Sequence, residues 1–174
     1  YVNHIWVADI TYIWIAGDVL YLHLVTDMYS HAVIGWCLSE TLEAENTVKA
    51  LNMAISTAGG INLCGTIHHS DRGSQYACRM YVDRLLDMHI RISMTERYNP
   101  TDNAVAERQN GILKTENIQV KEFYHDRKEA EADIAKAIEF HNCVRPHMSI
   151  GMKRPMDVYR KEKPGKNLWK KKQG

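Results

Sequence analysis

Long apolar runs and paired cysteines are the features that this sequence of 174 residues most clearly lacks. No stretch approaches the ~18 consecutive apolar residues of a membrane span. The opening residues, Tyr1-Val2-Asn3-His4, also lack the basic segment and apolar core of a signal peptide. These absences exclude a membrane protein and predict a soluble protein of the cytoplasm. Because the chain begins without methionine, at the edge of a predicted strand, we expect it to be a segment of a longer protein.

The four cysteines are too widely spaced to form a zinc knuckle. Cys37, Cys64, Cys78 and Cys143 include no C-x-x-C pair and have no matching histidine spacing. We therefore predict reduced, structural thiols, which is typical of a reducing compartment. The adjacent pair His68-His69 lies close to the candidate acid Asp71, and a zinc site there remains an alternative.

Charge is nearly balanced overall but unevenly distributed along the chain. The formal net charge is +1, yet residues 151–174 contain nine Lys or Arg against Asp157 and Glu162. A basic segment of this kind can neutralise DNA phosphates and release their counterions, which gives affinity independent of sequence. The alternative is a solvated tail with no binding role.

The apolar pattern predicts a mixed sheet with helices packed on it. In chain order it predicts strands over 4–15, 19–27 and 32–38, a helix over 44–58, a strand over 66–70, a helix from Ser74 to Leu85, a strand over 91–93, and helices over about 104–120 and 128–142. Three strands in a meander, followed by alternating helices and strands, predict an α/β fold with a mixed five-stranded sheet flanked by α-helices.

Three carboxylates stand in unusual sequence contexts. Asp9 interrupts an apolar strand, Asp71 directly follows the strand 66–70, and Glu107 lies in the first turn of the helix that begins after Asn103. Polar groups at the ends of neighbouring strands tend to meet, which would bring Asp71 toward Asp9. Crowded carboxylates repel one another unless a cation lies between them, and carboxylate oxygens are the ligands that Mg²⁺ prefers. The triplet therefore predicts a two-metal site for phosphoryl transfer.

Each of these acids also has an ordinary structural explanation. Asp9 could face solvent, Asp71 could cap the turn before Gly73, and Glu107 could be a first-turn acid favoured by the helix dipole. The functional interpretation depends on all three occurring together.

Four strings carry a resemblance to a known family. They are Asp9-Ile10-Thr11-Tyr12, the segment 68–76 (HHSDRGSQY), the segment 102–107 (DNAVAE) and the segment 113–116 (LKTE). Together they resemble the DDE transposases of bacterial insertion sequences, whose catalytic core is similar to retroviral integrase. The interval of 35 residues between Asp71 and Glu107 also matches that family.

The resemblance implies a ribonuclease H-like fold, with an integrase-like catalytic core over residues 1–145 and a basic C-terminal extension over 146–174. It makes Asp9, Asp71 and Glu107 the catalytic and metal-binding residues for two Mg²⁺ ions, for which Mn²⁺ can substitute. It implies DNA strand cleavage and strand transfer, with transposon-end DNA and target DNA as partners. It also implies a homodimer or higher oligomer in the bacterial cytoplasm, associated with the nucleoid, and a DNA-recognition region outside this chain.

Five further residues are candidates for DNA contact: His69, Arg72, Asn103, Lys114 and Lys121. All but Arg72 have a stated structural alternative, since a strand histidine usually packs, Asn103 suits a helix N-cap, and the lysines could be solvated. Asp27 is a possible stray metal ligand for which a turn role is expected. The aromatic residues Trp6, Trp14, Trp36 and Tyr76 are predicted to lie in the core.

Two other functions remain open at this point. One is a ribonuclease H-like nuclease that only hydrolyses, with Glu43 or Glu45 as an added metal ligand. The other is an inactive DNA-binding or assembly module that uses the basic tail. The complete acid triplet speaks against the inactive module, whereas analysis of the reaction products would separate the nuclease from the transposase.

Overall fold

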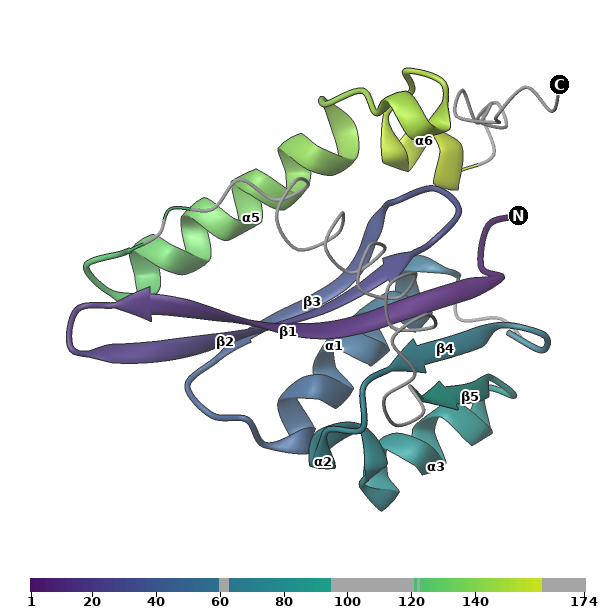
Figure 1. The fold of residues 1–174 in the computed structure, drawn as a ribbon, viewed down its shortest axis with the longest axis horizontal. Coiled ribbons are helices and arrows are strands. Elements are labelled where there is room, and N and C mark those ends of the chain that lie inside the picture. Colours follow the sequence, from purple (N-terminus) through teal and green to yellow (C-terminus); the bar gives the residue numbers. More distant parts are fainter. Residues whose placement is uncertain (60–62, 95–120, 122, 161–174) are drawn as a thin grey trace, which may run out of the picture.

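The protein folds around one five-stranded sheet with helices on both of its faces (Figure 1). The computed structural model describes residues 1–59, 63–94, 121 and 123–160. The strands are β1 (Ile5–Ile15), β2 (Asp18–Asp27), β3 (Val33–Ser39), β4 (Ile67–Ser70) and β5 (Arg91–Met94). The helices are α1 (Ala44–Thr57), α2 (Ser74–Ala77), α3 (Arg79–Asp87), α5 (Arg127–Cys143), the 3-10 turn η1 (Met148–Ile150) and α6 (Pro155–Tyr159).

The strand order is β3-β2-β1-β4-β5. The first three strands form an antiparallel meander, whereas β4 and β5 run parallel to β1 and to each other. Gly17, with φ of 80°, supplies the left-handed residue that the tight turn between β1 and β2 needs. The predicted mixed five-stranded sheet is confirmed, and the fold is ribonuclease H-like.

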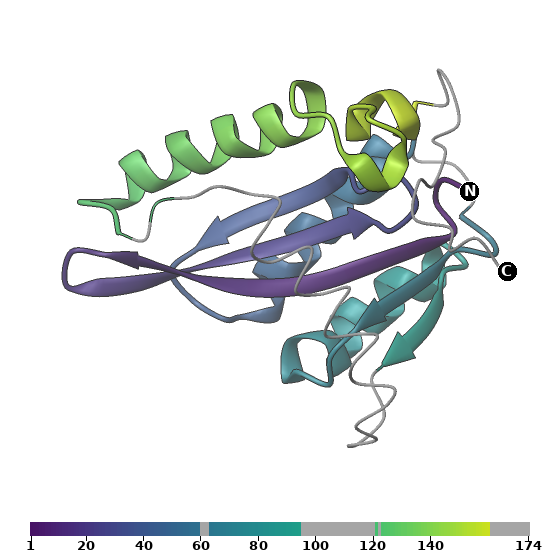
Figure 2. The ribbon, with the colours of Figure 1, turned by 45° about the horizontal axis from the view of Figure 1, so that its top comes forward.

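Two apolar clusters cover the two faces of the sheet (Figures 1 and 2). Helices α1 and α3 pack on one face around Trp6, Leu51 and Leu85. Helix α5 packs on the other face, where Ile134 and Ile138 meet Leu22. The alternating side-chain directions of β1 serve both clusters, because Trp6 and Ala8 point to the first and Ile13 points to the second.

The predicted helix from Ser74 to Leu85 is wrong in one respect. Cys78, with ψ of 149°, is extended, so the helix divides into α2 and α3. Helix α6 and the turn η1 were not predicted. Tyr159 at the end of α6 packs in the core of the α1 face and donates a hydrogen bond to Asn3 Oδ1 at 2.8 Å. The boundary drawn at residue 145 stays a prediction.

The aromatic residues divide between core and surface. Trp6 and Tyr76 are 0% and 1% exposed, as predicted, and Trp36 is half-buried. Trp14, however, is 59% exposed, so its predicted core position is wrong. It projects to the same face as Trp6, but the β1–β2 hairpin extends beyond the end of α1, and no described helix covers it there (Figure 1).

All four cysteines are free thiols, which agrees with the sequence. Among the described helices, none is both long and apolar enough to cross a membrane. The predicted helix over 104–120 lies outside the described residues.

Candidate active site

Asp9 and Asp71 are carried by two neighbouring parts of the sheet, because Asp9 lies in β1 and Asp71 directly follows β4. In the parallel ladder between β1 and β4, Val7 is paired with His69. Asp9 and Asp71 each stand two residues beyond this last pair, Asp9 within β1 and Asp71 just past the end of β4. The sheet therefore joins two acids that are separated by more than sixty residues in the sequence.

The two carboxylates differ in their surroundings. Asp9 is half-buried within β1, and its Oδ2 atom is shielded from solvent. Asp71 is exposed just past the end of β4, and its Oδ1 accepts a hydrogen bond from the Gly73 backbone N–H at 2.9 Å. That bond fixes the turn into α2, as expected for an Asx turn, without using the second carboxylate oxygen in the contact. Asp71 can thus hold the turn through Oδ1 and bind a cation through its other carboxylate oxygen.

A buried aromatic cluster lies behind the acid pair. His68 Nε2 is 2.8 Å from Tyr81 Oη, and both rings meet Tyr76 at centroid distances of 6.3 Å and 5.4 Å respectively. Burial lowers the pKa of His68 to about 4, so its ring is neutral at physiological pH. This role for His68 is structural, and the zinc alternative gains no support.

The Tyr76 hydroxyl is the exception in this cluster. Its Oη is shielded from solvent and has no hydrogen-bond partner among the described residues. Burial, Tyr81, and then the negative charges of Asp9 and Asp71 all raise the pKa of this hydroxyl. The sequence indicated only a core aromatic residue at this position. The available signal was its interval of five residues after Asp71.

The predicted DNA-contact residues do not all lie together. Arg72 is exposed beside Asp71, whereas His69 is half-buried and its Nδ1 is 3.0 Å from Ser93 Oγ on β5. Lys121 pairs with Glu129 at 2.9 Å and is not helical. Its neighbour Tyr124 bridges to Ile15, roughly 20 Å along β1 from Asp9. Glu107, Asn103 and Lys114 lie outside the described residues.

The residues present fit a hard divalent cation, although they do not complete its ligand shell. Within the described ranges, no group of three or more His, Cys, Asp or Glu residues could hold a metal ion. Asp9 and Asp71 supply two neighbouring carboxylates, which are suitable donors for Mg²⁺. The predicted third ligand, Glu107, falls in the segment 95–120.

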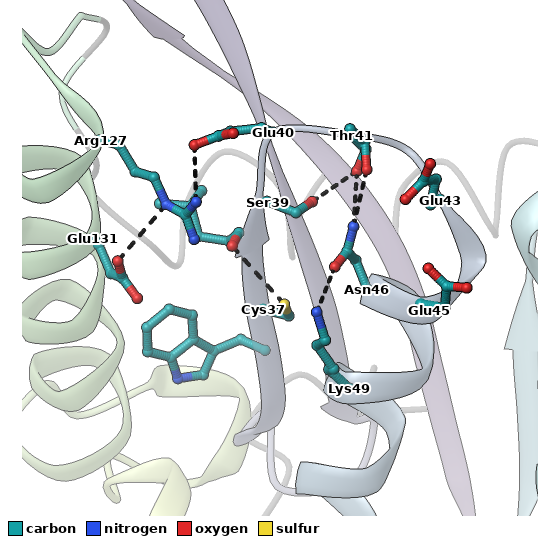
Figure 3. A pocket seen from close by; sticks show the side chains of 12 residues that line it. Cys37, Ser39, Glu40, Thr41, Glu43, Glu45, Asn46, Lys49, Arg127 and Glu131 are labelled. Carbon is teal, nitrogen blue, oxygen red and sulfur yellow. Dashed lines mark hydrogen bonds and ion pairs between the residues drawn. The ribbon is translucent and has the colours of Figure 1, made fainter.

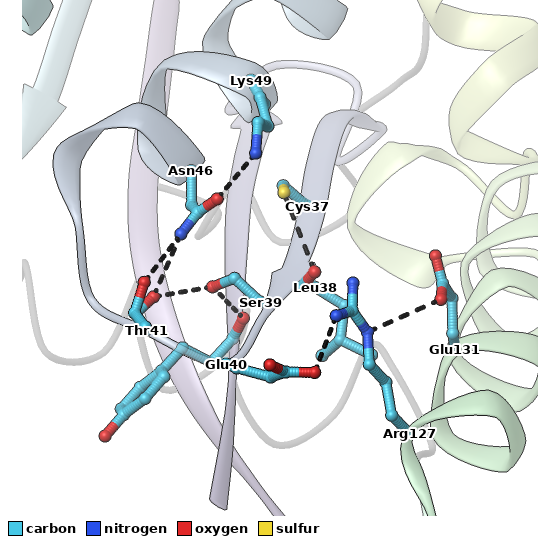
Figure 4. A network of polar contacts seen from close by, with 10 residues as sticks. Cys37, Leu38, Ser39, Glu40, Thr41, Asn46, Lys49, Arg127 and Glu131 are labelled. Carbon is cyan, nitrogen blue, oxygen red and sulfur yellow. Dashed lines mark hydrogen bonds and ion pairs between the residues drawn. The ribbon is translucent and has the colours of Figure 1, made fainter.

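A separate cavity of about 520 Å³ lies along the outer edge of β3, between α1 and α5 (Figure 3). Glu43 and Glu45 line it together with Arg127. Hydrogen bonds and ion pairs tie its walls together, including Arg127 Nη1 to Glu40 Oε1 at 2.9 Å and Lys49 Nζ to Asn46 Oδ1 at 2.9 Å (Figure 4).

This cavity bears on the proposed hydrolytic nuclease. Strand β3 lines the cavity, and β2 lies between β3 and β1, which carries Asp9. Among the described residues, neither Glu43 nor Glu45 forms a metal-binding group with Asp9 and Asp71, so the added ligand expected for that nuclease is not supported.

Asp27 has the structural role that was expected of it. Its carboxylate accepts hydrogen bonds from the backbone N–H groups of Asn3 and Ser30 and from the Ser30 hydroxyl. These contacts hold the turn after β2, and the residue is fully buried.

The chain is similar to transposases of bacterial insertion sequences. It is 32% identical over 159 residues to a putative transposase for IS986/IS6110 from Mycobacterium tuberculosis, covering 90% of this chain and 57% of that protein. It is also 32% identical over 163 residues to the IS904 transposase from Lactococcus lactis, covering 89% of this chain and 60% of the relative. The chain thus spans somewhat more than half the length of these relatives.

Solved structures of retroviral integrases share the fold. The magnesium complex of the HTLV-2 integrase catalytic core, in its dimeric form, aligns with a TM-score of 0.61 and 21% identity over 90% of this chain and 96% of that one. The simian T-cell lymphotropic virus intasome aligns with a TM-score of 0.68 and 22% identity over 95% of this chain and 58% of that one.

Family models agree with both comparisons. A model described as an integrase core domain matches residues 1–100, which include Asp9 and Asp71, and a second model of the same description matches residues 88–155. With the acid pair, the sheet order and these matches in agreement, the chain belongs to the integrase core domain family.

Proposed function

We propose that this chain is the catalytic core of an insertion-sequence transposase that cleaves DNA strands and joins a freed 3′ hydroxyl to another phosphodiester. The observation that supports the proposal is the parallel β1–β4 pairing, because Asp9 and Asp71 each follow its last pair, Val7 and His69, by two residues. Membership of the integrase core domain family and the names of the bacterial relatives support it. Glu107, at the predicted interval from Asp71, completes the proposed catalytic set.

The proposed reaction depends on divalent cations, with two Mg²⁺ ions as the expected complement and Mn²⁺ as a substitute. Such ions, when bound, stabilise charge on the phosphate and on the leaving oxygen. Asp9 and Asp71 would hold them, and the Gly73 backbone N–H keeps the Asp71 carboxylate oriented at the end of β4. A magnesium complex is known for the HTLV-2 integrase core, which has the same fold.

The proposed partners are transposon-end DNA and target DNA, and the proposed assembly is a homodimer or higher oligomer in the bacterial cytoplasm. Of the residues suggested for DNA contact, Arg72 is exposed beside Asp71 and is the best placed to meet a phosphate. His69, Asn103, Lys114 and Lys121 remain proposals. For Lys121, the ion pair with Glu129 would have to open on DNA binding.

A joining assay tests the function. The chain is incubated with Mn²⁺, a supercoiled plasmid and a labelled duplex that carries a free 3′ hydroxyl. We expect labelled DNA of plasmid size, its loss in Asp71→Asn, and its retention in Asp87→Asn, a control that alters an exposed aspartate on α3.

Two other results would favour the alternatives. Nicking that depends on Mn²⁺ without any joined product would indicate a nuclease that only hydrolyses. No nicking, together with no Mn²⁺ binding in calorimetry, would indicate an inactive DNA-binding module.

A further inference from the structure

A buried hydroxyl without a hydrogen-bond partner is an unusual feature beside a pair of carboxylates. Tyr76 is 1% exposed, and its Oη has no partner in the described part of the chain. Buried polar groups are nearly always hydrogen-bonded, because desolvation without a new bond is unfavourable. An exception therefore calls for a group that the described residues do not supply.

The position of Tyr76 limits what that group can be. Its backbone N–H donates to the Gly73 carbonyl in the first turn after Asp71, at 2.9 Å. Its ring is held in the same cluster as Trp6 and Ala8, which lie on β1 just before Asp9. Tyr76 is thus tied to the turn that follows Asp71 and belongs to the same apolar cluster as the strand that carries Asp9. Burial, followed by smaller effects of Tyr81, Asp9 and Asp71, raises the pKa of its hydroxyl, so the group stays protonated.

Of the two rings beside Tyr76, Tyr81 is already paired, whereas His68 Nδ1 is likewise buried without a hydrogen-bond partner among the described residues. The equivalent group of Tyr81 is occupied, since Tyr81 Oη lies 2.8 Å from His68 Nε2. The Tyr76 and Tyr81 ring centroids are 5.4 Å apart at an interplanar angle of 73°. Tyr81 therefore packs against the ring of Tyr76, while its own hydroxyl is hydrogen-bonded to His68.

We propose that Tyr76 is a positioning residue for the metal site, whose hydroxyl donates a hydrogen bond to the Asp9–Asp71 carboxylate pair, or to a water held between them, when a divalent cation binds. This role rests on the proposed function, because it presupposes ion binding by the acid pair. Hydrogen bonds to metal-binding carboxylates fix their orientation and increase affinity for the ion. The proton stays on Tyr76 throughout, so the hydroxyl orients the ligands and takes no part in bond breaking.

Two tyrosines in one cluster provide a matched comparison. Tyr76→Phe removes a hydroxyl without a partner, whereas Tyr81→Phe removes one that is hydrogen-bonded to His68. A purely structural role for both predicts that Tyr81→Phe is the more harmful change in every measurement. A positioning role for Tyr76 predicts that Tyr76→Phe weakens metal binding, whereas Tyr81→Phe lowers thermal stability.

The test combines calorimetric titration of the full chain with Mn²⁺ and thermal melting without metal. We expect Tyr76→Phe to bind Mn²⁺ about tenfold more weakly than wild type while melting at the wild-type temperature or above it. We expect Tyr81→Phe to melt at a lower temperature while its Mn²⁺ affinity stays within about twofold of wild type.

Two results would contradict the positioning role of Tyr76. Wild-type Mn²⁺ affinity in Tyr76→Phe, or weakening only in step with a lower melting temperature, would overturn the positioning role. Asp71→Asn serves as the reference for loss of the metal site. If wild type binds no more Mn²⁺ than Asp71→Asn does, the metal site of the proposed function fails, and the role of Tyr76 fails with it.

Discussion

The side-chain amide of Asn142 closes the outer edge of β3 at Val33. Asn142 Nδ2 donates to the Val33 carbonyl at 2.8 Å, and the Val33 N–H donates to Asn142 Oδ1 at 2.9 Å. Because β3 is the last strand on its side of the sheet, these backbone groups have no neighbouring strand to pair with. One residue near the end of α5 therefore satisfies two buried backbone groups and joins the helix to the sheet.

Replacing this amide should destabilise the fold. Asn142→Ala leaves the Val33 N–H and C=O without partners, and we expect the free energy of unfolding to fall by about 2 to 4 kcal/mol. Asn142→Asp keeps the acceptor and loses the donor, so its loss should be smaller. Urea denaturation of both variants provides the measurement. Equal stability of Asn142→Ala and wild type would show that the pair contributes nothing.

Gly35 should be intolerant of any side chain because α1 passes directly over it. A Cβ at this position would lie within 3.0 Å of backbone atoms of Ala50 and Ala54, which cannot move without displacing the helix. We expect Gly35→Ala to cost about 3 kcal/mol or more in urea denaturation.

Gly65 provides the contrasting case for that measurement. It has φ of 93°, and a Cβ added there would have no atom within 4 Å. Gly65→Ala therefore causes only backbone strain, which we expect to cost about 1 to 2 kcal/mol. If the two substitutions cost the same, close packing of α1 on β3 would not be what requires Gly35.

Stability should decline as the pH falls from neutral, in part through His23. Its ring is fully buried, with Nε2 2.9 Å from Ser39 Oγ and Nδ1 3.0 Å from Thr47 Oγ1. Burial lowers its pKa from 6.5 to about 4, so the unfolded chain takes up a proton before the folded chain does. The contribution of His23 is complete above pH ~6.5 and decreases below it, at up to about 1.4 kcal/mol per pH unit, until pH ~4.

Urea denaturation at several pH values between 7.5 and 4.5 tests this behaviour. His23→Gln should make the dependence of stability on pH shallower, since the glutamine does not titrate. His125→Gln alters an exposed side chain and serves as the control. An unchanged slope in His23→Gln would argue against titration of this residue as a cause.

Glu107→Gln tests the third member of the predicted triad, which lies outside the described residues. The amide keeps the shape of the side chain but removes the charge that a metal ligand needs. We expect loss of strand transfer by at least about 100-fold with DNA binding near wild type, as measured by the joining assay and by fluorescence anisotropy. Retained joining would remove Glu107 from the catalytic set.

Arg72→Gln tests DNA contact beside the acid pair. If the guanidinium binds one phosphate, the slope of log affinity against log salt should become shallower by about 0.9. Arg79→Gln is the matched control, because Arg79 is exposed on α3 and already pairs with Asp83. Equal slopes for the two variants would place Arg72 outside the DNA interface.

Much of this architecture could be predicted from local patterns alone. The β-branched and aromatic residues of β1, the turn at Gly17 and the apolar spacing of α1 are short-range signals, and these three elements were found as predicted. The break at Cys78 was missed because residues 74–85 keep a helical apolar pattern across it. The exposed position of Trp14 was missed because local sequence does not reveal where a covering helix ends.

The sequence by itself determined which residues are proposed to carry the chemistry, since Asp9, Asp71 and the segment around Asp71 were recognisable from their contexts and from the family resemblance. Only the tertiary structure decided how Asp9 and Asp71 are arranged in space. The parallel pairing of β1 with β4 joins distant parts of the sequence, and it brings the strand that carries Asp9 beside the strand that precedes Asp71. Burial likewise depends on the whole fold, which is why the core tyrosine predicted at position 76 has a hydroxyl with no partner among the described residues.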